Sequence, residues 1–391
     1  MKPDFEWKGE EIYLDNAATT VMDDEVVRAM QPYLEERFGN PETVYRLGRE
    51  ARDAVETARK QVARVLRCKP EEIYFTSGGT ESNNWAIKGI RFQSPGKNII
   101  VVGSVEHASV VESANWMMRM GLASEYMAPV DEFGMVKLDA LELYLKDGKV
   151  GLVSVQFANN EVGTIQPVAA IADLCKKYGA LFHCDAVQAY GKVEMDIDDI
   201  RADMISISAH KIHGPMGVGA LYVKAGTPLE PLLHGGGHES GMRSGTLAVQ
   251  QIVGFGKAAE MADDVRGVEM SRLSSVVDSL AKDMALVFGA VRNGHPTNRL
   301  PNILSVTVPK MDASVICGIM CSHYGICLST GAACSTAKGD SHVLRAMGKS
   351  AFAATSTLRI SLSRYNTESQ VRLFVSRLQA GVNEMSKRSL I

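Results

Sequence analysis

Short apolar runs alternate with amphipathic stretches through the first two thirds of the chain. The apolar runs have the length of β-strands, and the amphipathic stretches repeat their apolar residues at the spacing of an α-helix. This alternation is typical of βαβ units, which build a mostly parallel sheet flanked by helices. Strands are predicted at 73–75, 98–102, 151–157, 180–184, 203–208 and 220–223, and helices at 50–66, 81–89, 110–120 and 168–177.

The last third of the chain begins with a helical segment, and the pattern changes after that segment. A long stretch, 253–288, is predicted to form one or two helices that lead away from the sheet. Strands follow at 302–308 and 326–329, and helices at 313–324 and 368–385. We therefore expect two α/β domains, a large one at residues 12–255 and a smaller C-terminal one at 256–391 that also takes in residues 1–11.

Composition narrows the class of protein. The 391 residues, 46% of them hydrophobic, are enough for a large core. A formal net charge of -3 without a basic stripe argues against direct contact with nucleic acid. No apolar run is long enough to span a bilayer, and the charged N-terminus lacks the apolar segment of a signal peptide. We expect a cytoplasmic protein without a membrane partner, whose seven cysteines are thiols rather than a disulfide framework.

Polar residues follow several of the predicted strands, at the sheet edge where α/β enzymes place their active sites. The segment "TSGGTE", residues 76–81, lies between a strand and a helix, and its bare amides suit a phosphate. It lacks the Lys-Ser/Thr ending of a nucleotide P-loop. An ordinary strand–helix turn is an equally good interpretation of this segment alone.

Three further strand ends carry residues that suit a flat, charged ligand. Asp185 can pair with a protonated ring nitrogen and Gln188 can donate to an oxygen of the same ring, although an aspartate here also suits a helix N-cap. His107 can stack on a ring or move a proton, or it is a structural histidine. Asn160 can reach a ligand oxygen, or it is a turn former.

Lys211 follows the strand at 203–208, with Ser208 and His210 beside it. Lysine reacts with carbonyl groups, including that of pyridoxal phosphate, while the serine and histidine suit the phosphate. The alternative for Lys211 is a solvated surface amine. A phosphate cradle, a carboxylate, an imidazole and a lysine at the strand ends of one sheet together form the set that a pyridoxal phosphate enzyme needs.

The motifs of the whole chain resemble those of the cysteine desulfurases, in the class V aminotransferase group of pyridoxal phosphate enzymes. The stretches that carry the resemblance are "YLDNAATT", "FGNPETVY", "YFTSGGTESNN", "EHASV", "ANNEVGTIQP", "DAVQAYGKV", "SAHKIHGPMGVGAL", "RSGT", "STGAACS" and "LRISLSRYNT". The resemblance implies fold type I, with a mostly parallel seven-stranded sheet flanked by helices in the large domain and a smaller α/β C-terminal domain.

The resemblance also implies roles for single residues. Lys211 joins pyridoxal 5'-phosphate covalently and moves protons, Asp185 pairs with the ring nitrogen, and Gln188 contacts the ring hydroxyl. His107 stacks on the ring and donates a proton. Phosphate contacts come from Gly79, Thr80, Ser208 and His210, with Thr246 from the partner subunit of a homodimer, and the substrate carboxylate is bound by Asn160 and Arg359. No metal is implied.

Cys334 stands in a segment of small residues and glycine without an apolar pattern to bury it. A thiol in such a segment suggests a chemical role, and Lys338 and His342 favour a thiolate. By resemblance, Cys334 takes sulfur from L-cysteine as a persulfide, L-alanine leaves, and the sulfur passes to an acceptor protein for iron–sulfur cluster, thiocofactor or tRNA biosynthesis.

Two alternative functions would use the same cofactor, and a third alternative would be non-catalytic. A selenocysteine lyase or another class V aminotransferase would use Lys211, Asp185 and His107 alike, and an aminotransferase would not need Cys334. A non-catalytic assembly scaffold would have lost Lys211. The chain departs from the family pattern at Tyr45, His238 and Ala248, where the family has histidine, glutamine and asparagine.

Overall fold

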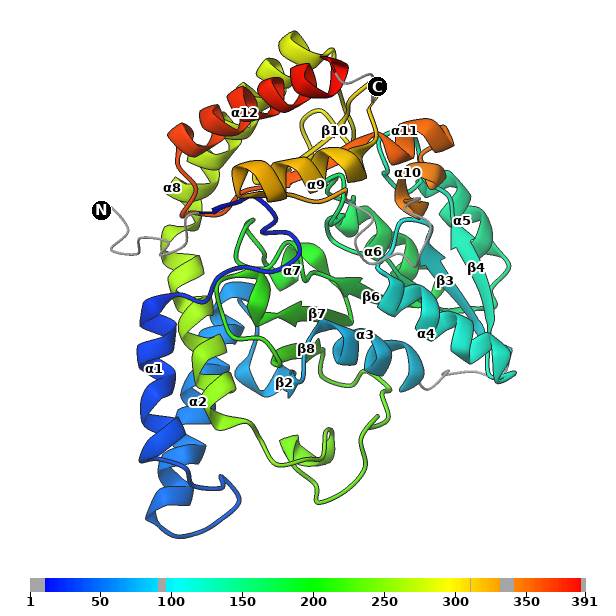
Figure 1. The fold of residues 1–391 in the computed structure, drawn as a ribbon. Coiled ribbons are helices and arrows are strands. Elements are labelled where there is room, and N and C mark those ends of the chain that lie inside the picture. Colours follow the sequence, from blue (N-terminus) through cyan, green and yellow to red (C-terminus); the bar gives the residue numbers. More distant parts are fainter. Residues whose placement is uncertain (1–10, 91–95, 310, 331–340, 388–391) are drawn as a thin grey trace.

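A seven-stranded sheet forms the centre of the computed structural model, which describes residues 11–90, 96–309, 311–330 and 341–387 (Figure 1). Its strand order is β2-β8-β7-β6-β5-β3-β4, and β8 runs antiparallel to both of its neighbours while the other pairs are parallel. This confirms the mostly parallel sheet. The strands are β2 (Ile73–Thr76), β3 (Ile99–Gly103), β4 (Ser124–Ala128), β5 (Val150–Ser154), β6 (Leu181–Asp185), β7 (Met204–Ser208) and β8 (Gly219–Val223).

Helices cover both faces of this sheet. In β3, Ile100 and Val102 belong to one hydrophobic cluster, which contains residues of the two helices α3 and α4. Ile99 and Val101 belong to another cluster, on the opposite face. Side chains alternate between the faces of a strand, so β3 is buried on both sides. The helices of this part are α1 (Asp24–Glu35), α2 (Arg46–Leu66), α3 (Gly79–Lys88), α4 (Ala108–Arg119), α5 (Leu138–Lys146), α6 (Val168–Tyr178) and α7 (Ile197–Ile200).

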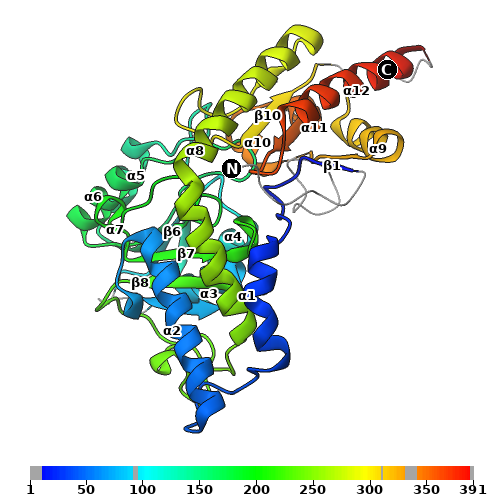
Figure 2. The same cartoon turned by 90° about the vertical axis from the view of Figure 1, so that its left-hand side faces the viewer.

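One continuous helix, α8 (Val249–Phe288), links the central sheet to the C-terminal part. Its first half packs against α1 and α2, and it also contacts α12 (Glu368–Lys387) (Figure 2). At Gly256 a Cβ would lie 2.6 Å from the Cα of Ala58 in α2, so only glycine permits this close helix approach. The segment predicted as one or two helices is therefore one.

The C-terminal part has a hydrophobic cluster of its own, built on an antiparallel sheet of order β12-β10-β9. The N-terminal strand β1 pairs with β11 in parallel and lies against this cluster. The predicted domain boundary at residue 256 falls inside α8 and remains a prediction. The elements are β1 (Ile12–Tyr13), β9 (Val291–Arg292), β10 (Ile303–Thr307), β11 (Ile326–Cys327), β12 (Thr357–Ser361), α9 (Ala313–Tyr324), α10 (His342–Ala346) and α11 (Ala351–Thr355).

Across the described ranges, every helix is too short or too polar to cross a membrane. The same ranges contain no group of three or more His, Cys, Asp or Glu side chains placed to hold a metal ion.

Two buried histidines make stability depend on acid. His183 lies between Ser154 Oγ, 2.8 Å from Nδ1, and Ser206 Oγ, 2.9 Å from Nε2. Burial lowers the pKa of His183 to about 4, and burial with nearby Arg364 lowers the pKa of His213 to about 3. The unfolded chain binds protons near pH 6.5 that the folded chain does not, so stability falls as the pH drops from about 6.5 toward about 4.

We expect the free energy of unfolding to fall by about 2 kcal/mol between pH 6 and pH 5 from these two rings together. Denaturant titrations at each pH measure it. The variant His183→Gln, which cannot be protonated, should lose about half of this dependence. An unchanged pH slope in that variant would show that His183 is not its source.

Candidate active site

A cavity of about 390 Å³ opens at the carboxyl ends of the parallel strands. Thr246 is exposed and does not line the cavity, and Cys334 lies outside the described residues. The other predicted site residues, which are far apart in the sequence, come together in this cavity. The cavity is lined by ten of the twelve predicted site residues: Gly79, Thr80, His107, Asn160, Asp185, Gln188, Ser208, His210, Lys211 and Arg359.

One end of the cavity is the N-terminus of α3. Gly78 precedes this helix with φ of 147°, a backbone conformation that favours glycine. A Cβ at Gly79 would lie 2.6 Å from the Val187 side chain, so the chain turns tightly at this point. The unpaired N–H groups of a helix N-terminus attract anions, and the Thr80 hydroxyl belongs to the same turn.

Ser208 and His210 face this turn from β7 and the short 3-10 helix Ala209–Lys211. His210 Nδ1 lies 3.1 Å from Thr19 Oγ1. Burial, together with the charges of Lys211 and Lys192, lowers the pKa of His210 to about 4. The ring is thus neutral near pH 7 and would contact an anion through a hydrogen bond.

Asp185 ends β6 and is buried. Its Oδ2 accepts a hydrogen bond from Asn83 Nδ2 at 2.7 Å, and its Oδ1 accepts one from the Val187 backbone N–H at 3.0 Å. These bonds fix the carboxyl group in the cavity wall, where it can pair with a ring cation. Asn83 is absent from the predicted residues because an asparagine inside a helix gives no sign of the carboxylate it contacts.

His107 is the N-cap of α4. Its Nδ1 accepts a hydrogen bond from the Ser109 backbone N–H at 3.1 Å, and Ser109 Oγ lies 2.8 Å away. A backbone N–H can only donate, so Nδ1 of the neutral ring carries no proton and Nε2 carries it. The cap therefore sets the tautomer and leaves Nε2–H as the hydrogen-bond donor of the neutral ring.

The Lys211 amine is held by two backbone carbonyls. Nζ donates to Ala17 O and to Ala18 O, both at 2.6 Å. The same Ala17 carbonyl accepts from Gln188 Nε2 at 2.8 Å. The N-terminal segment thus joins the cavity wall through its main chain, and the amine of Lys211 is directed inside the molecule rather than into solvent.

Arg359 has capacity left to bind an anion. It is 3% exposed, its Nη2 lies 2.8 Å from Asp15 Oδ1, and its Nη1 donates to Asn160 O at 3.1 Å. Within the described part of the chain, Nε is buried without a hydrogen-bond partner. A buried guanidinium with an unused donor suits a carboxylate ligand.

The residues that flank the segment 331–340 are attached to the cavity walls. Ser329 and Arg359 exchange two backbone hydrogen bonds, of 3.3 and 2.7 Å. After the segment, Ser341 Oγ donates to Glu161 Oε2 at 2.5 Å, and His342 Nε2 donates to the carbonyl of Glu106 at 2.9 Å. In the sequence, Glu161 follows Asn160 and Glu106 precedes His107, and both Asn160 and His107 line the cavity.

The three departures from the family pattern lie away from the cavity. Tyr45 is exposed and precedes α2, Ala248 is exposed and precedes α8, and His238 accepts a hydrogen bond from the Gly245 backbone N–H at 3.2 Å. None of the three lines the cavity.

The donors and acceptors of the cavity fit pyridoxal 5'-phosphate. The α3 N-terminus, Ser208 and His210 all line the cavity and offer donors that suit a phosphate. The carboxylate of Asp185 suits a protonated ring nitrogen, and the amine of Lys211 is within the same cavity. The unused donor of Arg359 remains for a substrate carboxylate. This set matches a cofactor that carries a phosphate, a protonated ring and an aldehyde.

The chain is similar to known proteins over nearly its whole length. The Aminotransferase class-V family model matches residues 12–374. A curated relative, cysteine desulfurase IscS of Methanosarcina thermophila, is 42% identical over 92% of this chain and 89% of its own length.

Solved structures of similar proteins also match the chain over nearly its whole length. A NifS-like protein has a TM-score of 0.89 and 39% identity, covering 95% of this chain and 99% of that chain. The structure described as SspA in complex with cysteine has a TM-score of 0.78 and 32% identity, covering 91% of this chain and 100% of that chain. With a matching fold and these relatives, the chain belongs to the class V aminotransferase family, and within it to the cysteine desulfurases, which depend on pyridoxal 5'-phosphate.

Proposed function

We propose that this cysteine desulfurase removes sulfur from L-cysteine, releases L-alanine and takes the sulfur onto Cys334 as a persulfide. The observation that carries the proposal is the cavity that unites the ten site residues around the amine of Lys211. A related structure is described as a complex with cysteine, which supports the choice of substrate.

Pyridoxal 5'-phosphate, when bound, supplies an electron-accepting ring attached through its aldehyde. Gly79, Thr80, Ser208 and His210 would hold its phosphate. Asp185 would keep the ring nitrogen protonated, because its carboxyl group is fixed by Asn83 and Val187 and cannot turn away.

Lys211 moves the proton of the substrate α-carbon. The carbonyls of Ala17 and Ala18 hold its Nζ inside the cavity, where the free amine would act as the base. An amine held in one place is an efficient general base, because its orientation costs no further entropy. His107 lines the same cavity and would act as a second proton donor through Nε2 when its ring is in the protonated, imidazolium form.

Arg359 and Asn160 orient the substrate by its carboxylate. The guanidinium offers its unused Nε, and the contact of Nη1 with the Asn160 carbonyl keeps the two residues together. Binding the carboxylate at this wall leaves the amine of the substrate free to reach the cofactor.

The variant Arg359→Gln is expected to raise KM for L-cysteine by about tenfold to a hundredfold, because a charge-assisted hydrogen bond to the carboxylate is lost. Steady-state alanine release measures it. Arg345→Gln, an exposed arginine outside the cavity, is the matched control and should leave KM unchanged. An unaltered KM in Arg359→Gln would remove Arg359 from the substrate site.

Cys334 completes the reaction in this proposal. Its thiolate attacks the substrate sulfur, a sulfur–sulfur bond forms, and the carbon–sulfur bond breaks with its electron pair left on carbon, which is protonated to the methyl group of alanine. Ser329 and Ser341, the described residues on either side that support this role, are hydrogen-bonded to Arg359 and to Glu161, which follows Asn160.

We further propose a cytoplasmic homodimer in which Thr246 of one subunit contacts the phosphate held by the other. Its exposure and its absence from the cavity of its own chain are compatible with this arrangement. The persulfide sulfur would pass to an acceptor protein for iron–sulfur cluster, thiocofactor or tRNA biosynthesis, as the IscS relatives suggest.

The test is to incubate the purified holoenzyme with L-cysteine and to measure alanine and protein persulfide together. In a single turnover without an acceptor, the two should appear in equal amounts. Alanine with free sulfide and no persulfide would contradict the role of Cys334, and neither product would contradict the reaction itself.

A further inference from the structure

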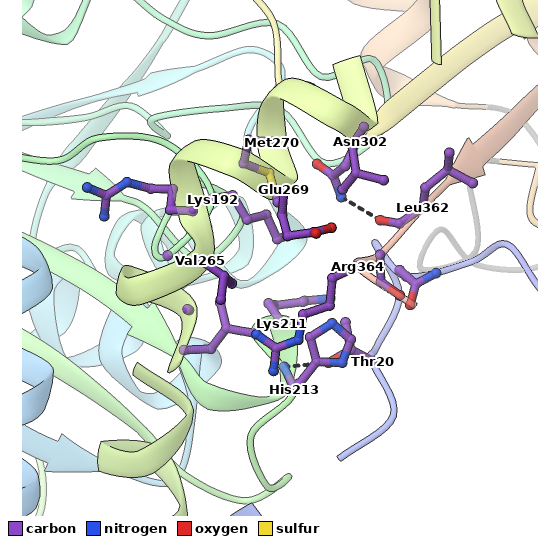
Figure 3. A pocket seen from close by; sticks show the side chains of 17 residues that line it. Thr20, Lys192, Lys211, His213, Val265, Glu269, Met270, Asn302, Leu362 and Arg364 are labelled. Atoms are coloured by element: carbon purple, nitrogen blue, oxygen red, sulfur yellow. Dashed lines mark hydrogen bonds between the residues drawn. The ribbon is translucent and has the colours of Figure 1, made fainter. Parts of the chain in front are cut away.

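A second lysine, Lys192, is buried beside the cofactor cavity. It is 6% exposed, and its Nζ donates to Gln188 Oε1 at 3.1 Å. It lines a small cavity of about 40 Å³ that Lys211 also lines, whereas Gln188 lines the large cavity (Figure 3). Lys192 therefore lies behind the wall of the site and reaches it through Gln188.

The contacts of Gln188 fix the orientation of its amide. A lysine amine with its protons donates to an acceptor, so the amide oxygen faces Lys192, and a carbonyl can only accept, so the amide nitrogen faces Ala17 O. One N–H of the amide is used by Ala17, at 2.8 Å. The second N–H remains to donate to a ligand oxygen in the cavity.

Burying the amine of Lys192 costs free energy, and an apolar side chain could pack at this position without that cost. The charged form loses its hydration, and burial together with Lys211 and Arg359 lowers the pKa of Lys192 to about 7. Among the described residues, the charges that shift this pKa are those two cations, and no carboxylate offsets them. An apolar side chain of the same length would fill this place with less loss of stability, so the amine is retained for what it contacts.

We propose that Lys192 is a positioning residue for the cofactor: it holds the Gln188 amide so that the site presents an N–H donor to the oxygen on the cofactor ring. This rests on the proposed role of Gln188. Without Lys192 the Ala17 carbonyl alone orients the amide, so the N–H donor is held less firmly toward the ring oxygen. A ring oxygen that carries negative charge prefers the donor.

The experiment is a double-mutant cycle with Lys192→Met and Gln188→Leu, which remove the donors and leave apolar side chains one atom shorter. Apoenzymes are titrated with pyridoxal 5'-phosphate, the dissociation constant is measured by absorbance, and the absorption maximum of the bound cofactor is recorded. Circular dichroism and thermal denaturation of the apoenzymes verify folding, and Lys192→Met should be at least as stable as the parent, because it removes a buried amine.

We expect Lys192→Met to weaken cofactor binding by about tenfold, the effect of one lost polar contact, and to move the absorption maximum in the same direction as Gln188→Leu. The double variant should be no weaker than Gln188→Leu alone. Lys192→Gln, which keeps a donor without the charge, should restore part of the affinity and of the absorption maximum.

Three results would overturn the proposal. They are cofactor affinity and absorption unchanged in Lys192→Met, additive losses in the double variant, or a loss in Lys192→Met that is matched by a loss of folded apoenzyme. A normal dissociation constant in Gln188→Leu would instead refute the proposed role of Gln188 itself, so the two failures are distinguishable.

Discussion

The variant Lys211→Ala is expected to lose alanine formation from L-cysteine by more than about a thousandfold, because the covalent anchor and the base for the α-proton disappear together. The carbonyls of Ala17 and Ala18 hold this amine inside the cavity, and no other amine of the described residues lines that cavity. Alanine release under single-turnover and steady-state conditions measures the loss.

Lys224→Ala is a suitable control for Lys211→Ala. Lys224 is exposed just beyond β8 and does not line the cavity, so its loss should leave the rate unchanged. Cofactor should still bind to Lys211→Ala through the phosphate and ring contacts, but more weakly and without the absorption of the covalent form. Alanine production within about tenfold of the parent rate would contradict the assignment of the base to Lys211.

The variant Cys334→Ala is expected to abolish persulfide formation and to reduce desulfuration by at least about a hundredfold, because the nucleophile for the substrate sulfur is gone. Cofactor absorbance and its change on adding L-cysteine should persist, since Lys211, Asp185 and Arg359 are intact. Persulfide labelling with a thiol-selective reagent and alanine release, measured on the same sample, separate the two effects.

The chain offers a second cysteine as a control for Cys334→Ala. Cys321 is exposed on α9, outside the cavity, and Cys321→Ala should keep both products at the parent level. Undiminished sulfide release by Cys334→Ala would indicate the lyase-like route, in which no enzyme thiol accepts the sulfur.

The sequence predicted the strands that are apolar along their whole length. The strands β3, β5, β7 and β8 are buried at every residue and appear as apolar runs. The edge strand β4, "SEYMA", is largely exposed and carries no such run, so it was not predicted. Helix α1 was also missed, because it buries only Val26 and Met30 and contains Pro32.

The candidate site was predictable to the extent that its chemistry resides in side chains. Lysine, aspartate and histidine at strand ends carry a signal in the sequence, Arg359 was predicted by the resemblance, and the structure brings these residues to one cavity. The contacts that orient these side chains carry no such signal in the sequence. The carbonyls of Ala17 and Ala18, which hold Lys211, belong to the main chain, and Asn83 and Lys192 act on site residues from positions that only the fold reveals.

The most direct test of the whole account is the covalent attachment of the cofactor. Borohydride reduces the bond between a lysine amine and the cofactor aldehyde to a stable one, and digestion followed by mass spectrometry of the peptides then locates it. We expect a single phosphopyridoxyl group on the peptide that contains Lys211, at that residue. A label on Lys192 or another lysine, or no label on a protein that has bound the cofactor, would contradict it.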